Sequence, residues 1–296
     1  MAVTFPGFES KKISVPSDDG PIDIACHVGG SGPALLLLHG FPQTKAIWHE
    51  VAPALAKHFT VVASDLRGYG ESSKPAGKAD HSSYSKRSMA ADQVALMKAL
   101  GHDQFFLLGH DRGGRVSHRL AMDHPKSVQK LMVLDISPTL CMYENTTMEF
   151  ARGYWHWFFL IQPEPVPETM ISANPEFWLK NHMGRHAGTG IFSPDRWAEY
   201  LAGASNPVGI HAMCEDYRAA ATIDLVHDRA DREAGKSLTM PIHVLWGEHG
   251  LVNRCFSPLN DWKRVASEVS GRPVPCGHYI PEEMPNIVID EARAFF

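Results

Sequence analysis

The stretch FFLLGHDRGGRV, residues 105–116, indicates how the chain is built. Its first half is an apolar run of the kind that forms a buried strand, and its second half begins a helical pattern. Between them lies a G-x-D-x-G sequence formed by Gly109, Asp111 and Gly113. Because glycines flank the centre, the chain can turn sharply and present the central side chain at the start of the helix. The segment predicts a strand, a tight turn carrying a carboxylate, and a helix.

Apolar runs of the same kind recur along the chain, separated by stretches with helical spacing. The further predicted strands lie at 33–40, 59–65, 128–138 and 240–250. The predicted helices lie at 83–101, 112–125 and 286–296. Strand–helix alternation of this kind predicts a mainly parallel sheet with helices on both faces.

Residues 139–235 interrupt the alternation. They hold no strand pattern, but they contain many aromatic side chains and proline-rich punctuation such as IQPEPVPE. This composition favours a helical cap inserted between two strands of the sheet. We therefore expect a core of residues 1–138 and 236–296 and a cap of residues 139–235.

Composition narrows the classes of function. The chain has 296 residues, of which 44% are hydrophobic and 21% charged, as in soluble globular proteins. A net charge of −5 without a basic run gives no reason to expect a nucleic acid or membrane partner. The five cysteines are scattered, and no apolar run approaches the roughly 18–20 residues that span a bilayer. With no secretion signal in the first residues, we expect a cytoplasmic protein.

Three further motifs carry side chains or backbone groups that suit catalysis. HGFP (39–42) follows one strand, where the backbone N–H of Phe41 can join that of Arg112 in an oxyanion hole. DLRGYGESS (65–73) follows the next strand, and GHYIPEEMP (277–285) places His278 in a late loop. A carboxylate such as Asp111 is a poor nucleophile for a carbonyl group but suits displacement at a saturated carbon.

These motifs together resemble the α/β-hydrolase superfamily over nearly the whole chain, and within it the aspartate-nucleophile branch of dehalogenases and epoxide hydrolases. The resemblance implies an eight-stranded, mostly parallel sheet flanked by helices, with an inserted helical cap. It also implies that Asp111 displaces a leaving group to form an enzyme ester, and that His278 then activates water to hydrolyse this ester. Such chemistry requires no cofactor and no metal ion.

The acid that orients His278 departs from the usual pattern of the superfamily. In the string WGEHG, Gly250 stands where an aspartate commonly follows the strand. Some dehalogenases place the acid one strand earlier, where this chain has Asp135 in VLDISPT. We expect Asp135 in this role, with Glu248 in a shifted geometry as the alternative. A simple turn cap is the other reading of Asp135.

Two arginines follow the predicted nucleophile. Alkyl-halide dehalogenases usually carry a tryptophan directly after the aspartate, whereas this chain has Arg112, with Arg115 three residues later on the same helix face. Guanidinium groups bind carboxylates through paired donors, so Arg112 and Arg115 are predicted to clamp a substrate carboxylate. The alternative is that they are surface charges or partners of acidic neighbours.

The cap strings GYWHWFF (153–159) and CEDYRAAATIDL resemble haloacetate dehalogenases, specifically the fluoroacetate dehalogenases. The resemblance implies that His156, Trp157 and Tyr217 donate hydrogen bonds to the leaving halide. Tyr154 and Tyr200 are the alternatives to Tyr217. It further implies haloacetate and water as substrates, glycolate as product, and a homodimer.

Two other functions remain open from the sequence. An epoxide hydrolase shares the HGxP motif and the aspartate turn, but typically uses two cap tyrosines to protonate the opening oxygen and has no need of an arginine pair. A non-catalytic ligand receptor of this fold tends to lose the nucleophile or the histidine, and this chain keeps both.

Overall fold

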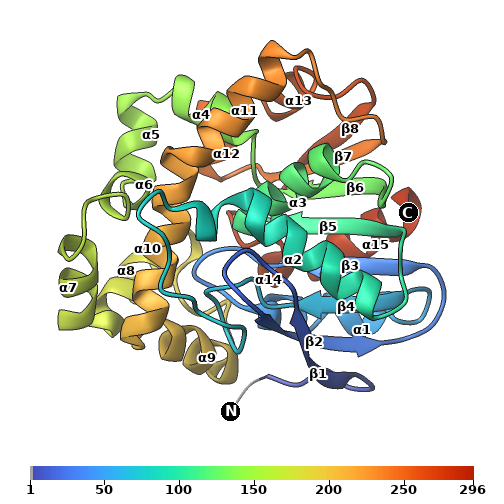
Figure 1. The fold of residues 1–296 in the computed structure, drawn as a ribbon, viewed down its shortest axis with the longest axis horizontal. Coiled ribbons are helices and arrows are strands. Elements are labelled where there is room, and N and C mark those ends of the chain that lie inside the picture. The colour runs from blue at the N-terminus through green and yellow to red at the C-terminus, as the bar shows by residue number, and fades with distance from the viewer. Residues whose placement is uncertain (1–2) are drawn as a thin grey trace.

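An eight-stranded sheet forms the centre of the structure, a computed structural model that describes residues 3–296 apart from the side chains of residues 185–187 (Figure 1). The strand order is β1-β2-β4-β3-β5-β6-β7-β8. β2 runs antiparallel to both of its neighbours, and every other pairing is parallel. The strands are β1 Glu9–Val15, β2 Ile22–Gly29, β3 Ala34–Leu38, β4 Thr60–Ser64, β5 Phe105–His110, β6 Val128–Leu134, β7 Ile242–Gly247 and β8 Val269–Val274. The mostly parallel sheet predicted from the sequence is confirmed.

Helices cover both faces of the sheet, because successive side chains of a strand point to opposite faces. In β3, Leu36 and Leu38 join the apolar cluster that includes residues of α2 and α3, whereas Leu35 and Leu37 join the cluster that includes residues of α1 and α15. The core helices are η1 Lys45–Trp48, α1 Val51–Leu55, η2 Ser82–Tyr84, α2 Lys86–Ala99, α3 Arg112–Asp123, α12 Leu251–Cys255, α13 Pro258–Trp262, α14 Ile280–Glu283 and α15 Pro285–Phe295. The unbroken apolar runs of the sequence therefore correspond to strands buried on both sides.

Eight helices follow one another between β6 and β7, where the sequence lacks a strand pattern. In Figure 1 most of them lie to the left of the sheet, in green to orange. They are α4 Thr139–Glu144, α5 Met148–Gly153, α6 His156–Phe159, α7 Val166–Ala173, α8 Pro175–Ala187, α9 Pro194–Ala204, α10 Pro207–Ala221 and α11 Ile223–Glu233. We refer to these eight helices as the cap.

Two of the element boundaries that differ from the sequence prediction have a clear local cause. The predicted helix at 83–101 is divided, because Ser85 is extended and its side chain accepts a hydrogen bond from the backbone of Ser88, which starts α2 afresh after η2. The predicted strand at 128–138 ends at Leu134, since Asp135 has a φ of 53°. The early end of β6 frees the side chain of Asp135 from the strand.

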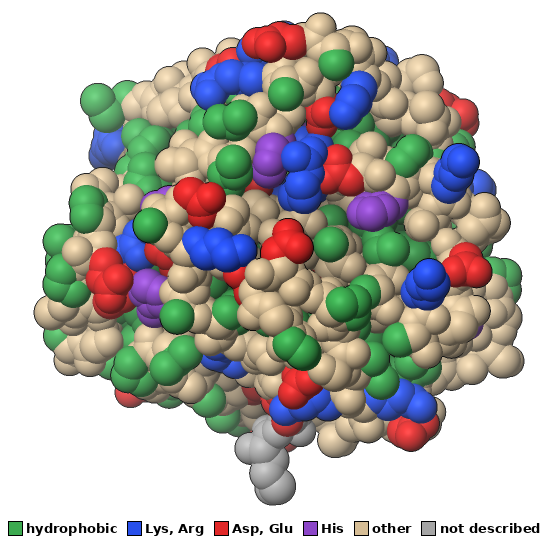
Figure 2. All heavy atoms as spheres, in the orientation of Figure 1, with side chains coloured by type: hydrophobic (Ala, Val, Ile, Leu, Met, Phe, Trp, Pro, Cys, Tyr) green, Lys and Arg blue, Asp and Glu red, His purple; other side chains and the backbone are tan. Residues whose placement is uncertain are grey.

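On the face shown in Figure 2, acidic and basic side chains are interspersed with each other and with hydrophobic ones. Within residues 3–296, none of the helices combines the length and apolar character that crossing a membrane requires.

Candidate active site

Asp111 occupies the turn between β5 and α3 and is only 4% exposed. Its backbone has a φ of 45° and a ψ of −114°, a conformation that non-glycine residues rarely adopt. The tight packing of the turn explains its glycines. A Cβ on Gly113 would lie 2.4 Å from the carbonyl oxygens of both Leu38 and His39. The sequence prediction of a strand, a tight turn and a helix around Asp111 is therefore confirmed.

The carboxylate of Asp111 is held in its ionised form. Burial by itself would raise the pKa of Asp111, but the charges of His278 and Arg115 outweigh burial and hold this pKa below its ordinary value. The backbone N–H of Phe41 donates to Oδ2 at 3.0 Å. Arg112 is the first residue of α3, so its backbone N–H has no partner within the helix. The turn thus combines an anionic side chain with backbone donors at its base.

His278 and Asp135 form a close pair. Nδ1 of His278 lies 2.5 Å from Oδ2 of Asp135, whose Oδ1 accepts the backbone N–H of Gly247 at 2.9 Å. Because Nδ1 donates to the carboxylate, Nε2 is the nitrogen left to accept a proton. The Glu248 side chain is exposed, so the structure brings Asp135 rather than Glu248 to the histidine.

His110 fixes the loop that carries His278. Its Nε2 lies 2.8 Å from the backbone carbonyl oxygen of His278. Burial, reinforced by the charge of His278, lowers the pKa of His110 to about 3, so His110 is neutral at pH 7 and donates to this carbonyl. The residue before Asp111 therefore connects the turn that carries Asp111 to the loop that carries His278.

Arg115 is buried without an ion-pair partner. Its Nη1 donates to the carbonyl oxygen of Ser137 at 3.3 Å and to Oγ1 of Thr139 at 3.1 Å, and its Nη2 lies 3.2 Å from the sulfur of Met142. Nε has no hydrogen-bond partner, and no carboxylate of the described residues forms a salt bridge with this guanidinium. Burial lowers the pKa of Arg115, although Asp111 acts in the opposite direction. Such a group is ready to bind an anion.

Arg112 has a different environment from Arg115. Its Nε and Nη2 both contact the carboxylate of Asp216, at 3.1 Å to Oδ2 and 2.6 Å to Oδ1, and Nη2 also donates to the backbone carbonyl of Asp216 at 2.7 Å. Within the described part of the chain, Nη1 alone of its side-chain nitrogens lacks a partner. The structure therefore brings both predicted clamp residues to the site, but it gives Arg112 an acidic neighbour of its own.

The side chains of the three predicted halide donors lie close to one another. The ring centroid of Tyr217 lies 5.7 Å from that of His156 and 6.4 Å from that of Trp157, and all three side chains are buried. The ring of Phe41 packs against Tyr217 at 4.9 Å and so connects the cluster with the turn that holds Asp111. The cap and the core thus meet over the carboxylate.

The alternative cap tyrosines have other contacts. The hydroxyl of Tyr200 donates to Glu282 at 2.7 Å, and that of Tyr154 lies 3.2 Å from Nδ1 of His278. The hydroxyl of Tyr217 is buried and has no hydrogen-bond partner among the described residues. Of the three, Tyr217 has the hydroxyl that is available to a ligand.

Several residues at the site were not predicted. Asp216, the partner of Arg112, directly precedes Tyr217 on α10. This adjacency is the one signal in the sequence that could have pointed to Asp216. Tyr154 was considered only as a halide donor, whereas its hydroxyl contacts His278. His182 of α8 lies with its ring 4.4 Å from that of His156 and stacks on Trp178. Nothing local in the sequence marks His182.

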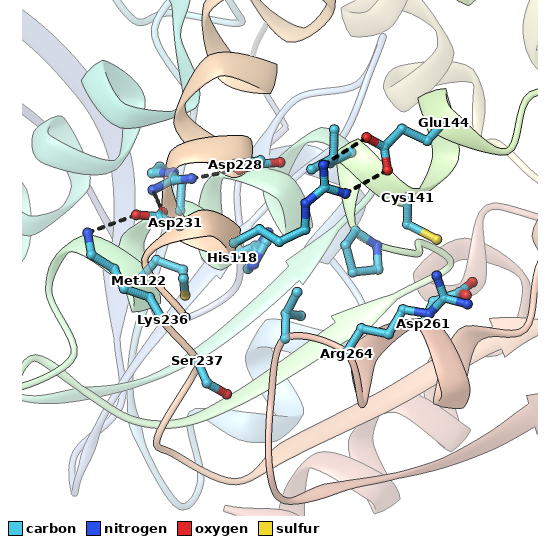
Figure 3. A pocket seen from close by; sticks show the side chains of 16 residues that line it. His118, Met122, Cys141, Glu144, Asp228, Asp231, Lys236, Ser237, Asp261 and Arg264 are labelled. Atoms are coloured by element: carbon cyan, nitrogen blue, oxygen red, sulfur yellow. Dashed lines mark hydrogen bonds and ion pairs between the residues drawn. The ribbon is translucent and has the colours of Figure 1, made fainter.

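A separate cavity of about 270 Å³ opens where α4 and α11 of the cap meet α3 and the region of α13 (Figure 3). His118 lies among its lining side chains, and salt bridges join Arg232 to Glu144 and Lys236 to Asp231 at its edge. None of the predicted site residues lines this cavity, so it is distinct from the Asp111 site. Among the described residues, no group of three His, Cys, Asp or Glu side chains is arranged to hold a metal ion.

Comparison with known proteins agrees with this geometry. A family model described as the alpha/beta hydrolase fold matches residues 33–285. A fluoroacetate dehalogenase of Burkholderia sp. is 46% identical over 98% of this chain and 93% of its own length. A soluble epoxide hydrolase of Corynebacterium sp. (strain C12) is 35% identical over 90% of this chain and 91% of its own. The crystal structure of an α/β-hydrolase from Nostoc sp. PCC 7120 superposes with a TM-score of 0.95 at 49% identity, covering 99% of both chains. The buried aspartate turn, its histidine–aspartate pair and these matches agree: the chain belongs to the α/β-hydrolase superfamily.

Proposed function

We propose that this hydrolase is a haloacetate dehalogenase that converts fluoroacetate, and also chloro- and bromoacetate, to glycolate and halide. The observation that carries the proposal is the buried guanidinium of Arg115, which has no carboxylate partner among the described residues and lies close enough to Asp111 to lower its pKa. A buried cation without a counterion is costly unless an anion binds beside it. A small substrate carboxylate supplies that charge.

The first chemical step is displacement by Asp111. Oδ2 already accepts a hydrogen bond from Phe41, whereas the described residues leave Oδ1 without one, so we assign the attack to Oδ1. Oδ1 forms a bond to the methylene carbon of the haloacetate as the carbon–halogen bond breaks, and the halide leaves with the bonding electron pair. Fluoride is small and strongly hydrated, so hydrogen bonds from His156, Trp157 and Tyr217 replace the water that it loses.

The second step is hydrolysis of the ester on Asp111. Nε2 of His278 takes a proton from water, and the resulting hydroxide attacks the carboxyl carbon of Asp111. Negative charge then develops on Oδ2, which the backbone N–H groups of Phe41 and Arg112 stabilise. The tetrahedral intermediate expels glycolate, whose oxygen takes the proton back from His278. Asp111 is left with the second proton of the water and releases it to solvent, which restores the carboxylate. Asp135 keeps His278 in the required tautomer throughout.

A second candidate is an epoxide hydrolase, which the 35% identical relative favours. That reaction requires cap tyrosines to protonate the leaving oxygen. Here the hydroxyls of two cap tyrosines, Tyr217 and Tyr143, have no partner among the described residues, whereas Tyr154 contacts His278 and Tyr200 contacts Glu282, so the tyrosines do not separate the two reactions. A neutral epoxide leaves the charge of Arg115 uncompensated. The charge of Arg115 therefore supports the haloacetate reaction.

The proposal is tested with fluoride- and chloride-sensitive electrodes on purified protein given fluoroacetate, chloroacetate and styrene oxide. We expect halide release from both acids and no diol from the epoxide. Diol formation without halide release would assign the second function, and neither product would favour a ligand receptor.

The covalent step has its own test. In a single turnover in ¹⁸O-labelled water, the glycolate should carry unlabelled oxygen that comes from Asp111. Label that enters glycolate in the first turnover would show direct attack by water on the substrate.

A further inference from the structure

Arg112 is part of a buried charge cluster that we call the Asp216 cluster, formed by Asp216, Arg112, Lys86 and Tyr69. The carboxylate of Asp216 accepts hydrogen bonds from Arg112, from Nζ of Lys86, and at 2.5 Å from the hydroxyl of Tyr69. Burial alone would raise the pKa of Asp216, but Arg112 and Lys86 reverse the effect and hold this pKa well below its ordinary value. Asp216 is therefore a permanent anion, and most of the charge of Arg112 is balanced within the protein.

The guanidinium of Arg112 lies over the ring of Tyr217, with Cζ 4.1 Å from the ring centroid. A cation over an aromatic face is attracted to the ring, most strongly when both are removed from water, as they are here. The paired bonds to Asp216 fix the plane of the guanidinium, because a bidentate contact sets orientation as well as distance. Contact with this oriented cation restrains the ring of Tyr217, and with it the position of the hydroxyl.

Arg115 also lies over an aromatic ring, but among the described residues it has no carboxylate partner comparable to Asp216. Its Cζ lies 4.6 Å from the ring centroid of Trp157, and neutral oxygen atoms and a sulfur hold its guanidinium. The two arginines thus lie against two of the three proposed halide donors, but only Arg115 keeps its charge available.

We propose that Asp216 is a positioning residue for halide binding. It holds Arg112 against the ring of Tyr217, which leaves Arg115 as the principal site for the substrate carboxylate. This inference rests on the proposed function. Among the described residues, Arg112 has only the NH₂ group of Nη1 without a partner and able to face the ligand, whereas Arg115 has no carboxylate partner. Halide selectivity then depends on a carboxylate that touches neither substrate nor halide.

The test compares fluoroacetate with chloroacetate in the variants Asp216→Asn and Arg115→Lys. Asp216→Asn should lower kcat for fluoroacetate by about tenfold more than kcat for chloroacetate and leave both KM values within a small factor, because a misplaced donor matters most for the poorer leaving group. Arg115→Lys should raise KM for both acids by about tenfold or more, with a similar effect on each. A Lys86→Arg variant, which keeps a cation on Asp216, serves as the matched control and should retain the fluoride-to-chloride ratio.

A double-mutant cycle with Tyr217→Phe separates positioning from a general structural effect. Once the hydroxyl is gone, Asp216→Asn should cost little further fluoroacetate activity, so the losses should be strongly non-additive. Fully additive losses, or equal losses on the two halides, would overturn the inference. If Asp216→Asn does not fold by circular dichroism, Tyr69→Phe takes its place in the cycle, since it removes one hydrogen bond to Asp216 without changing a charge.

The outcomes also distinguish the inference from the function on which it rests. A wild-type protein that releases no halide would refute both. A wild-type dehalogenase with an additive cycle would refute the role of Asp216 alone.

Discussion

At the scale of single residues, the charges of neighbouring groups decide whether a side chain at this site is ionised. Asp111 is buried, which opposes ionisation, yet its pKa is lowered by the cationic groups around it, with His278 foremost. The protonated acid lacks the negative charge of the carboxylate and is a much weaker nucleophile, so in the proposed reaction we expect the displacement step to be lost as the pH falls through the pKa of Asp111 in the folded protein. A lowered pKa therefore keeps the nucleophile active across the whole neutral range.

This linkage gives a prediction for His278→Asn. The variant should release one halide per active site and then stall, because displacement does not need the general base and ester hydrolysis does. Its halide burst should also lose rate at a higher pH than the wild-type burst, since the foremost charge that lowers the pKa of Asp111 is gone. Rapid-quench halide release from pH 3 to 8 measures both effects. Sustained turnover would assign water activation to another residue.

A second prediction concerns Trp157→Phe, which removes one proposed halide donor and keeps a ring beneath Arg115. A donor that is fully used in the transition state contributes about 2–4 kcal/mol. Chloride is the better leaving group and the weaker acceptor, so it gains less from the same donor. Fluoroacetate turnover should fall by about 100-fold or more, whereas chloroacetate turnover should fall much less. Equal losses of turnover on the two acids would show that Trp157 only packs within the cap and does not bind the halide.

Among the elements, β3 to β7 were predicted from their apolar runs, whereas β1, β2 and β8 were not. β3 and β5 read as unbroken apolar runs, whereas β1 (ESKKISV) and β8 (VSGRPV) are edge strands that mix charged, polar and turn-forming residues. In the site, the G-x-D-x-G motif pointed to Asp111, and the family resemblance led us to expect Asp135 and His278 beside it. The pairing of Arg112 with Asp216 lay beyond sequence reasoning, because 104 residues separate them and only the docking of α10 on α3 brings them together.

The turn between β5 and α3 yields an element-scale prediction through Gly113→Ala. The added Cβ would lie 2.4 Å from backbone oxygens that cannot move without disturbing β3. We expect the free energy of unfolding to fall by about 1–3 kcal/mol, and halide release to fall by about 100-fold because Asp111 is displaced. Urea unfolding and the electrode assay measure the two effects.

Gly203→Ala in α9 is the matched control, since its Cβ would meet no atom within 4 Å. This variant should be as stable as the wild type or up to about 1 kcal/mol more stable. A Gly113→Ala protein that behaves like the control would show that the turn tolerates a side chain.

For the whole molecule, the cap exposes apolar side chains away from the site. Met170 on α7 and Phe177 on α8 are 62% and 64% exposed. Exposed apolar side chains that gather on one part of a surface are typical of association sites. Together with the homodimer that the family resemblance implies, these side chains motivate a prediction about assembly.

We predict that the wild-type protein elutes, by size-exclusion chromatography with light scattering, at twice its chain mass of 32.8 kDa. Met170→Lys combined with Phe177→Lys should shift it to the mass of one chain, because two charges would have to be buried in the interface. Val226→Lys on α11, where the valine is 56% exposed, is the control and should leave the mass unchanged. A wild-type protein with the mass of a single chain would contradict the dimer.

The burial of Asp111 affects how fast a substrate can enter the site and how fast products can leave it. With the cap in place, the carboxylate and His278 are almost sealed from solvent, at 4% and 6% exposed. In the proposed reaction, we therefore expect the cap and core to part at least once in each turnover, to admit the acid and to release glycolate and halide. Separations of this kind take microseconds to milliseconds and move against the friction of the solvent. A fast-reacting acid such as bromoacetate should consequently turn over at a rate that falls as solvent viscosity rises, whereas fluoroacetate, which is slowed by its own strong bond, should keep its rate in the same thickened buffer.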